Sequence, residues 1–127
     1  MTAREEASRL LELARMDLTA LRHMENPEHF ADPVFGFHAQ QAVEKALKAW
    51  LCLRAVSYPK THDLRLLLRL LQDQGENVAS FLSLMDLTDF AVQFRYDVPE
   101  LGPDLERGCV ADLAETLLDH ISSLLAK

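Results

Sequence analysis

The chain has 127 residues, of which 49% are hydrophobic, and its 20 acidic and 13 basic residues give a formal net charge of −7. These values fit one domain over residues 1–127 and exclude a generic nucleic-acid coat, which would be basic overall. No apolar run approaches the roughly 20 residues that cross a bilayer, and charges throughout residues 1–15 argue against a signal peptide. We therefore expect a cytoplasmic protein that does not bind a membrane.

The composition predicts an all-α fold. The chain holds 24 Leu and 15 Ala but only 7 Val and 1 Ile, and strands draw on β-branched residues whereas Leu and Ala favour helices. Cys52 and Cys109 have no Cys or His neighbour at zinc-ligand spacing. We expect both to be reduced, buried thiols, and we expect neither a metal site nor a cofactor.

The first two helices are bounded by prolines. Apolar residues at helical spacing predict a first helix over about residues 2–24, which Asn26-Pro27 ends. The second helix begins at Asp32, a candidate cap, with Pro33 at its first position, and continues to about Arg54.

Three further amphipathic helices complete the predicted bundle. Thr61 is expected to cap the third helix, and Gly75 to end it. The fourth is predicted over about 77–96 and the fifth over about 103–125. Short connections between four or five such helices indicate an up-and-down bundle. The fourth helix is expected to bury Phe81, Leu84, Met85, Thr88, Ala91 and Val92.

Charge is unevenly distributed along the chain. Residues 38–69 carry six basic and two acidic side chains, a net charge of +4, whereas residues 70–127 sum to −8 and residues 1–37 to −3. The basic segment is either a solvated face that pairs with acidic neighbours or a site for an anion such as phosphate.

One face of the second helix carries a polar stripe (Gln40, Gln41, Glu44, Lys45 and Lys48). It could hold a nucleotide or a partner helix through charge-assisted hydrogen bonds. Alternatively it is an ordinary exposed face with a Glu44–Lys48 pair worth about 0.3–0.5 kcal/mol. Spacing alone favours the ordinary face.

Three other residues are candidates for chemistry. His62 lies at the start of the third helix, where it either helps the turn or contributes a neutral imidazole. Arg95 ends the fourth helix, where it binds the last carbonyls or reaches Glu44 or a bound anion. His38 is either a polar core residue or an interface residue.

Three segments together resemble a known family. They are F-H-A-Q-Q-A-V-E-K-A-L-K-A-W-L from Phe37, P-K-T-H-D-L from Pro59 and F-R-Y-D from Phe94. In this order they resemble the HEPN domain family over essentially the whole chain. The resemblance implies a helical bundle, commonly dimeric, and a small prokaryotic protein often encoded beside a minimal nucleotidyltransferase. Such pairs act as toxin–antitoxin or related defence modules.

Many members of the wider family are metal-independent RNases, but this sequence departs from their motif. The motif is an Arg followed, after four to six residues, by a His. The positions at that distance from Arg95 are Glu100, Leu101 and Gly102. Arg15 and His23, and likewise Arg54 and His62, have seven residues between them, and Arg22 and His29 enclose a proline. The sequence therefore favours a protein without RNase activity.

Three hypotheses follow. In the first, a homodimer binds a nucleotide, RNA or a nucleotidyltransferase partner without catalysis. In the second, it is an RNA-cleaving toxin that uses Arg95 with His62 or His38. In the third, it is a structural partner whose polar stripe is buried against another subunit, with Lys45 and Lys48 engaged by acidic residues of the C-terminal half. The binding residues of the first hypothesis are Gln41, Glu44, Lys45, Lys48, His62 and Arg95.

Overall fold

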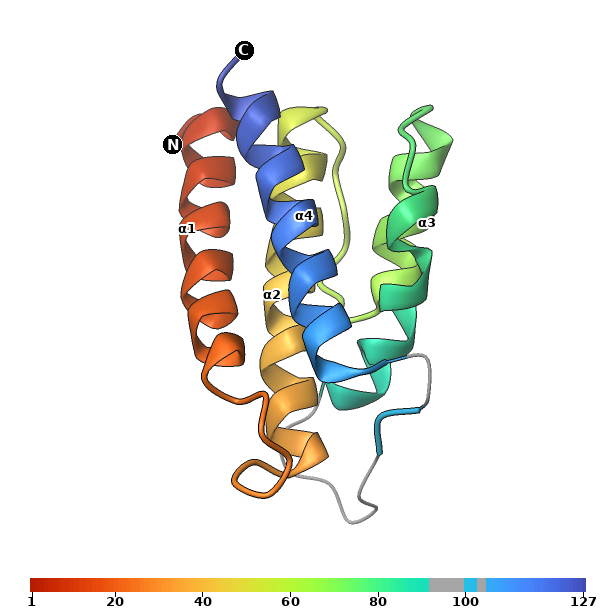
Figure 1. Ribbon diagram of the computed structural model, residues 1–127. Coiled ribbons are helices and arrows are strands. Elements are labelled where there is room, and N and C mark those ends of the chain that lie inside the picture. The colour runs from red at the N-terminus through yellow and green to blue at the C-terminus, as the bar shows by residue number, and fades with distance from the viewer. Residues whose placement is uncertain (92–99, 103–104) are drawn as a thin grey trace.

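The computed structural model describes residues 1–91, 100–102 and 105–127, and this part of the chain holds helices and no strand. The prediction of an all-α bundle is therefore confirmed (Figure 1). In chain order the helices are α1 (Ala3–Arg22), α2 (Asp32–Leu53), α3 (Leu64–Asp73), the 3₁₀ helix η1 (Ala79–Phe90) and α4 (Arg107–Leu125).

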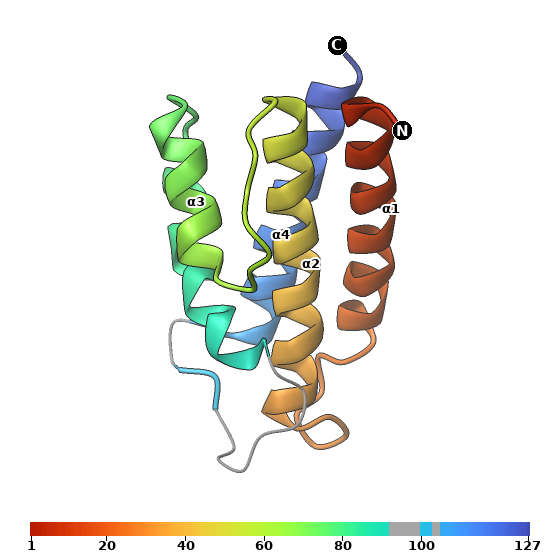
Figure 2. The same ribbon diagram turned by 180° about the vertical axis from the view of Figure 1, so that it is seen from behind.

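Helix α2 is the centre of the bundle and packs against each of the other four helices. The long helices α1, α2 and α4 lie side by side, while α3 and η1 form a second layer along α2 (Figures 1 and 2). Between α2 and α3 the chain turns back along α2, and we call this segment the return loop (residues 54–63). The central position explains why Phe35, Leu47 and Trp50 are almost fully buried. Within the described residues, no helix combines the length and apolar character that crossing a bilayer requires.

Several helix starts differ from the prediction. Ala31, not Asp32, is the N-cap of α2, because the Asp32 carboxylate accepts hydrogen bonds from Leu101 N and from Arg107 instead. Helix α4 starts at Arg107, later than predicted, and Glu106 caps it by accepting two backbone N–H bonds. Contacts with distant residues decide which side chain caps each of these helices, and capping rules based on neighbouring residues cannot predict such contacts.

The start of α3 also differs. Asp63 rather than Thr61 caps it, by accepting a hydrogen bond from Arg65 N. The Thr61 hydroxyl accepts from Asp63 N and so forms a turn just before the helix. Both residues therefore contribute to this helix start: Thr61 forms the turn, and Asp63, two residues later, forms the cap.

The prediction of an α-helix over 77–96 was wrong in type, because Ala79–Phe90 forms a 3₁₀ helix. A 3₁₀ helix has three residues per turn, so side chains three apart share a face. The buried apolar residues follow that period, whereas Met85, Thr88 and Ala91, expected in the core from a 3.6-residue period, are only half-buried. The buried residues are Val78, Phe81, Leu84, Leu87 and Phe90. Val92, also expected in the core, lies outside the described residues.

Two helix ends share one hydrogen-bond pattern but differ in residue. α3 ends as predicted at Gly75, whose φ is +80°, and α2 ends at Ala55, whose φ is +56°. At both ends the backbone bonds are those of a Schellman motif. The left-handed conformation suits glycine but costs an alanine about 1–2 kcal/mol. The return loop therefore begins at a strained residue.

The prediction that both thiols are buried was wrong for Cys109 and only partly right for Cys52. Both are free, but Cys52 is half-buried and Cys109 is exposed. The face of α4 that enters the core carries Val110 and Ala114, and Cys109 precedes Val110 by one residue, about 100° around the helix. The Glu106 carboxylate beside it raises the pKa of the Cys109 thiol.

Candidate functional site

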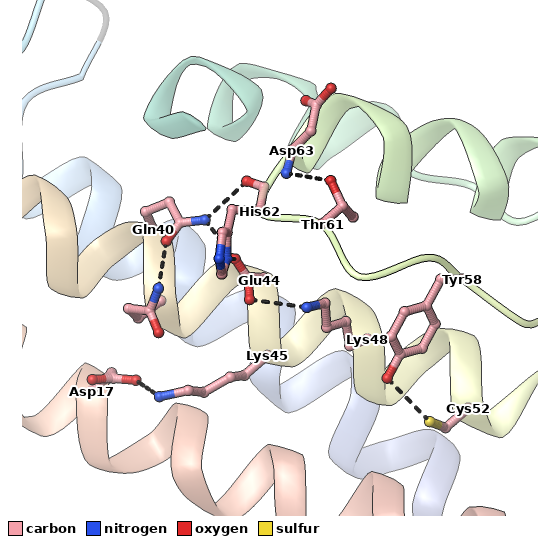
Figure 3. Close-up of polar contacts among 11 residues, drawn as sticks. Asp17, Gln40, Glu44, Lys45, Lys48, Cys52, Tyr58, Thr61, His62 and Asp63 are labelled. Carbon is pink, nitrogen blue, oxygen red and sulfur yellow. Dashed lines mark hydrogen bonds and ion pairs between the residues drawn. The ribbon is translucent and has the colours of Figure 1, made fainter. Parts of the chain in front are cut away.

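Three residues of the polar stripe, Gln40, Glu44 and Lys48, lie on the side of α2 that the return loop covers (Figure 3). Gln40 and Glu44 are buried, and Lys48 has a side chain only 16% exposed. The alternative of an ordinary exposed face is therefore wrong. The sequence could not show this, because the covering comes from a loop about 20 residues further along the chain.

Glu44 is the centre of what we call the Glu44 network (Gln40, Glu44, Lys48 and His62). One carboxylate oxygen accepts from Gln40 Nε2 and from His62 Nδ1, both at 2.8 Å. The other accepts from Lys48 Nζ at 3.1 Å. Burial is the largest single influence and raises the pKa of Glu44. The hydrogen bonds from Gln40, His62 and Lys48 together outweigh it and hold the pKa below the usual range. Glu44 is thus a buried, ionised acceptor.

The Glu44 network also fastens the return loop to α2. Gln40 Nε2 donates to the backbone oxygen of His62 at 3.1 Å, and Gln40 Oε1 in turn accepts from Gln41 Nε2 at 2.8 Å. Both ends of the buried Gln40 amide are therefore satisfied. Of the predicted binding residues, Gln41, Glu44, Lys48 and His62 are brought together here.

Lys45 takes a different direction, toward α1. Its Nζ lies 2.7 Å from Asp17 Oδ2, and His38 Nδ1 lies 3.4 Å from the other oxygen of the same carboxylate. Both lysines of the polar stripe are thus paired within their own chain. The structural hypothesis expected them to be paired with acidic residues from the C-terminal half. Their acceptors, Asp17 and Glu44, belong to the N-terminal half instead.

Tyr58 anchors the middle of the return loop and was missed by the sequence reasoning. Its hydroxyl lies 3.9 Å from Cys52 Sγ, and Lys48 Nζ lies 5.6 Å from its ring centroid. Burial raises the pKa of Tyr58 to about 12. Figure 3 shows the Lys48 side chain between Glu44 and Tyr58, so Lys48 has a contact on each side.

A cavity of about 450 Å³ opens where the return loop meets α2, and we call it the return-loop pocket (Lys48, Lys60, Thr61 and His62). Lys60 is exposed and, among the described residues, has no ion-pair partner within 4 Å. The His62 side chain is 66% exposed. Because Nδ1 is bonded to ionised Glu44, Nε2 is the nitrogen left for a ligand.

Sequence reasoning did not assign Lys60 and Thr61 to a site. The available signal was their position directly before His62 in the segment P-K-T-H. Arg95, expected at the rim, lies outside the described residues. No group of three or more His, Cys, Asp or Glu that could hold a metal ion occurs in the described part of the chain.

A second polar cluster lies at the start of α2, and we call it the Arg107 clamp (Met24, Phe30, Asp32 and Arg107). The buried guanidinium donates to the backbone oxygens of Met24 at 2.7 Å and Phe30 at 2.6 Å. It also donates to Asp32 Oδ1 at 2.8 Å. Its carbon lies 5.0 Å from the ring centroid of Phe35. Nothing in the local sequence around Arg107 marks it, because its acceptors are 75 or more residues away.

The helical bundle and the Gln–Glu–Lys–His network on its central helix define the class of protein, a small helical domain with a polar site under a loop. The model of the HEPN domain matches residues 7–126, nearly the whole chain. The chain therefore belongs to the HEPN domain family. Membership supports a nucleotide- or RNA-related module in general. Comparison with curated proteins and with solved structures gives no match.

Proposed function

We propose that this HEPN protein is a non-catalytic module that binds a nucleotide or RNA at the return-loop pocket. In this proposal it acts as a cytoplasmic homodimer beside a minimal nucleotidyltransferase, in a toxin–antitoxin or defence pair. Family membership supports the nucleotide-related role. The pairing has its own simple test, the neighbouring gene: a minimal nucleotidyltransferase is expected there, and a gene of unrelated chemistry would contradict the pairing.

The observation that carries the binding role is the cationic lining of the pocket. Lys48, Lys60 and Thr61 offer an ammonium, a second ammonium and a hydroxyl around one cavity of about 450 Å³. Cavities of this size are typical of small-molecule sites. Lysine ammonium groups and hydroxyls are donors for phosphate oxygens. The chain as a whole is acidic, so this local concentration of donors is distinctive.

The Glu44 network supports the same role by holding the donors in place. Lys48 uses one of its three N–H groups on Glu44 at 3.1 Å, and His62 uses only Nδ1. Two N–H groups of Lys48 and one ring nitrogen of His62 therefore remain for a ligand. Such preorganisation reduces the entropy that binding has to offset.

Calorimetric titration of the purified protein with ATP, GTP and a short oligoribonucleotide tests the proposal. Binding of at least one of them is expected, and Lys60→Ala should weaken it about tenfold. Lys45→Ala is the matched control, because Lys45 is paired with Asp17 and does not line the pocket. The absence of binding by all three ligands would rule out the direct nucleotide role, as would equal losses in the two variants.

One observation favours a second candidate, a metal-independent RNase. The Glu44 carboxylate lies 2.8 Å from His62 Nδ1 and orients an exposed imidazole, and a histidine held by a carboxylate is a common general base. The test is cleavage of a labelled RNA in the presence of a chelator. Cleavage that His62→Ala abolishes would replace the binding role, and intact RNA would support it.

A further inference from the structure

We infer that the return-loop pocket recognises a terminal phosphate group, as in a nucleoside monophosphate or a 5′-phosphorylated RNA end, rather than an internal phosphodiester. The inference rests on the proposed function, since it names the ligand class of the same site. It depends on the number, charge and kind of donors in the lining, which are all on described residues.

The number of donors fits a terminal phosphate. Each of the four lining side chains can still donate: Lys48 and Lys60 through Nζ, Thr61 through its hydroxyl, and His62 through Nε2 when protonated. A phosphate monoester presents three acceptor oxygens, whereas an internal phosphodiester has only two that are not in ester linkage. Three donor side chains, and a fourth when Nε2 carries a proton, line one cavity and are therefore better satisfied by the terminal group.

The charge of the pocket points the same way. Among the described residues, Lys48 and Lys60 bring two ammonium groups to the lining, and Lys48 shares its charge with Glu44 at 3.1 Å whereas Lys60 has no ion-pair partner within 4 Å. A phosphate monoester carries about −1.5 to −2 at neutral pH and a phosphodiester one charge per phosphate, so the monoester gains more from two ammonium groups. When His62 is neutral, a singly protonated monoester can still donate its O–H to Nε2, and a diester has no such proton.

The kind of donor indicates that the pocket does not distinguish one nucleotide base from another. Reading a base requires hydrogen bonds to its edge or a platform of aromatic rings. Among the described residues, the lining holds no side-chain amide or carboxylate for a two-point contact with a base edge, and its one ring is the His62 imidazole, which is not a platform by itself. The nearby Tyr58 ring contacts Lys48, and its hydroxyl lies beside Cys52. We therefore expect AMP and GMP to bind within about threefold of each other.

The experiment compares one oligoribonucleotide in 5′-phosphorylated and 5′-hydroxyl forms, by titration of the full-length protein at constant ionic strength. The phosphorylated form should bind at least tenfold tighter. Lys60→Gln should remove most of that difference, and Lys45→Gln, the matched control, should keep it. AMP and inorganic phosphate should each displace the phosphorylated RNA, and adenosine should not. Weaker displacement by inorganic phosphate than by AMP would assign the site to a phosphate ester rather than free phosphate.

The outcomes separate this inference from the proposed function. Equal affinity for the two RNA forms would overturn the terminal-phosphate inference while leaving RNA binding intact. Displacement by adenosine would also overturn it, because the base or sugar would then carry recognition. Binding of neither RNA and of no nucleotide would overturn both.

Discussion

Two polar clusters involve α2, each with a buried charged residue at its centre, and they differ in the donors and acceptors that they leave free for a ligand. The Arg107 clamp, at the start of the helix, directs its guanidinium at two backbone oxygens and the Asp32 carboxylate. The Glu44 network, in the middle, collects donors from Gln40, Lys48 and His62 around one carboxylate. In the first a cation is the centre and its acceptors surround it. In the second an anion is the centre.

This difference explains why only one of the clusters is a candidate anion site. The side chain of Arg107 is 7% exposed, so the clamp is closed to a ligand. The cavity beside it is lined by Glu25, Asp32 and Glu106, whose carboxylates repel a phosphate. In the Glu44 network the outer residues, Lys48 and His62, line the return-loop pocket, and Lys48 keeps two N–H groups and His62 its Nε2 for a ligand. A cluster with an anionic centre thus presents cations outward.

The largest effect that we expect is loss of the clamp. Arg107→Met keeps the volume but leaves the oxygens of Met24 and Phe30 without their donor and Asp32 without its counter-charge. Removing one partner of a buried charged cluster costs about 3–5 kcal/mol. The free energy of unfolding from urea denaturation, followed by the fluorescence of the buried Trp50, measures this loss.

Arg15→Met is the control for the clamp. Arg15 also joins two helices, through an exposed pair with Asp119 at 3.1 Å, and exposed pairs contribute about 0–1 kcal/mol. If both variants lost the same free energy of unfolding, burial would not make the Arg107 clamp more stabilising than an exposed ion pair, contrary to our expectation. Neither variant should change ligand affinity in the return-loop pocket.

A smaller loss is expected from the Glu44 network. Glu44→Gln keeps the shape but removes the charge that Lys48 and His62 contact, and a hydrogen bond to a charged group is worth about 1.5–3 kcal/mol. Unlike the clamp variant, it should raise hydrogen exchange in the return loop selectively. Glu115→Gln, at an exposed pair with Arg22, is the control and should change stability by less than about 1 kcal/mol. Unchanged exchange in the loop would show that the network does not fasten it.

Acid should remove the contribution of Glu44. Its pKa is lowered in the folded protein, because the hydrogen bonds from Gln40, His62 and Lys48 outweigh the effect of burial. As the pH falls below about 4.3, the pKa of an unperturbed glutamate, Glu44 therefore takes up a proton more readily in the unfolded chain than in the folded protein. The stability difference between wild type and Glu44→Gln should be full above about pH 5 and shrink as the pH falls through the folded-state pKa. A difference that stays constant from pH 7 to pH 3 would contradict this origin.

Local sequence predicted the parts of the fold that depend on local chemistry. The helical class follows from Leu and Ala, and the end of α3 follows from Gly75. The 3₁₀ helix was mistaken for an α-helix, although the three-residue spacing of Phe81, Leu84, Leu87 and Phe90 was visible. At Gly36 the reason for glycine was invisible, because an added Cβ would lie 2.2 Å from the Phe90 ring, 54 residues away.

The candidate site, too, could be predicted only where it depends on neighbouring residues in the sequence. Glu44, Lys48 and His62 were selected as residues of one face and one turn, and they do meet. Which lysine stays available could not be read from spacing, because the answer depends on Asp17 of α1 pairing with Lys45. Lys60 gained its role only once the return loop had placed it beside Lys48.

The smallest expected effect concerns how the return loop begins. Ala55 and Gly75 end α2 and α3 in the same Schellman pattern with positive φ, so the two positions form a matched pair. Ala55→Gly should stabilise the protein by about 0.5–1 kcal/mol by relieving strain, and Gly75→Ala should destabilise it by a similar amount. Ligand affinity at the pocket should change less than twofold in Ala55→Gly, because Gln40 and Glu44, not the strained residue, hold His62. A several-fold loss of affinity would instead show that the conformation of Ala55 positions the return loop. The Glu44 network would then only stabilise a loop position that Ala55 sets.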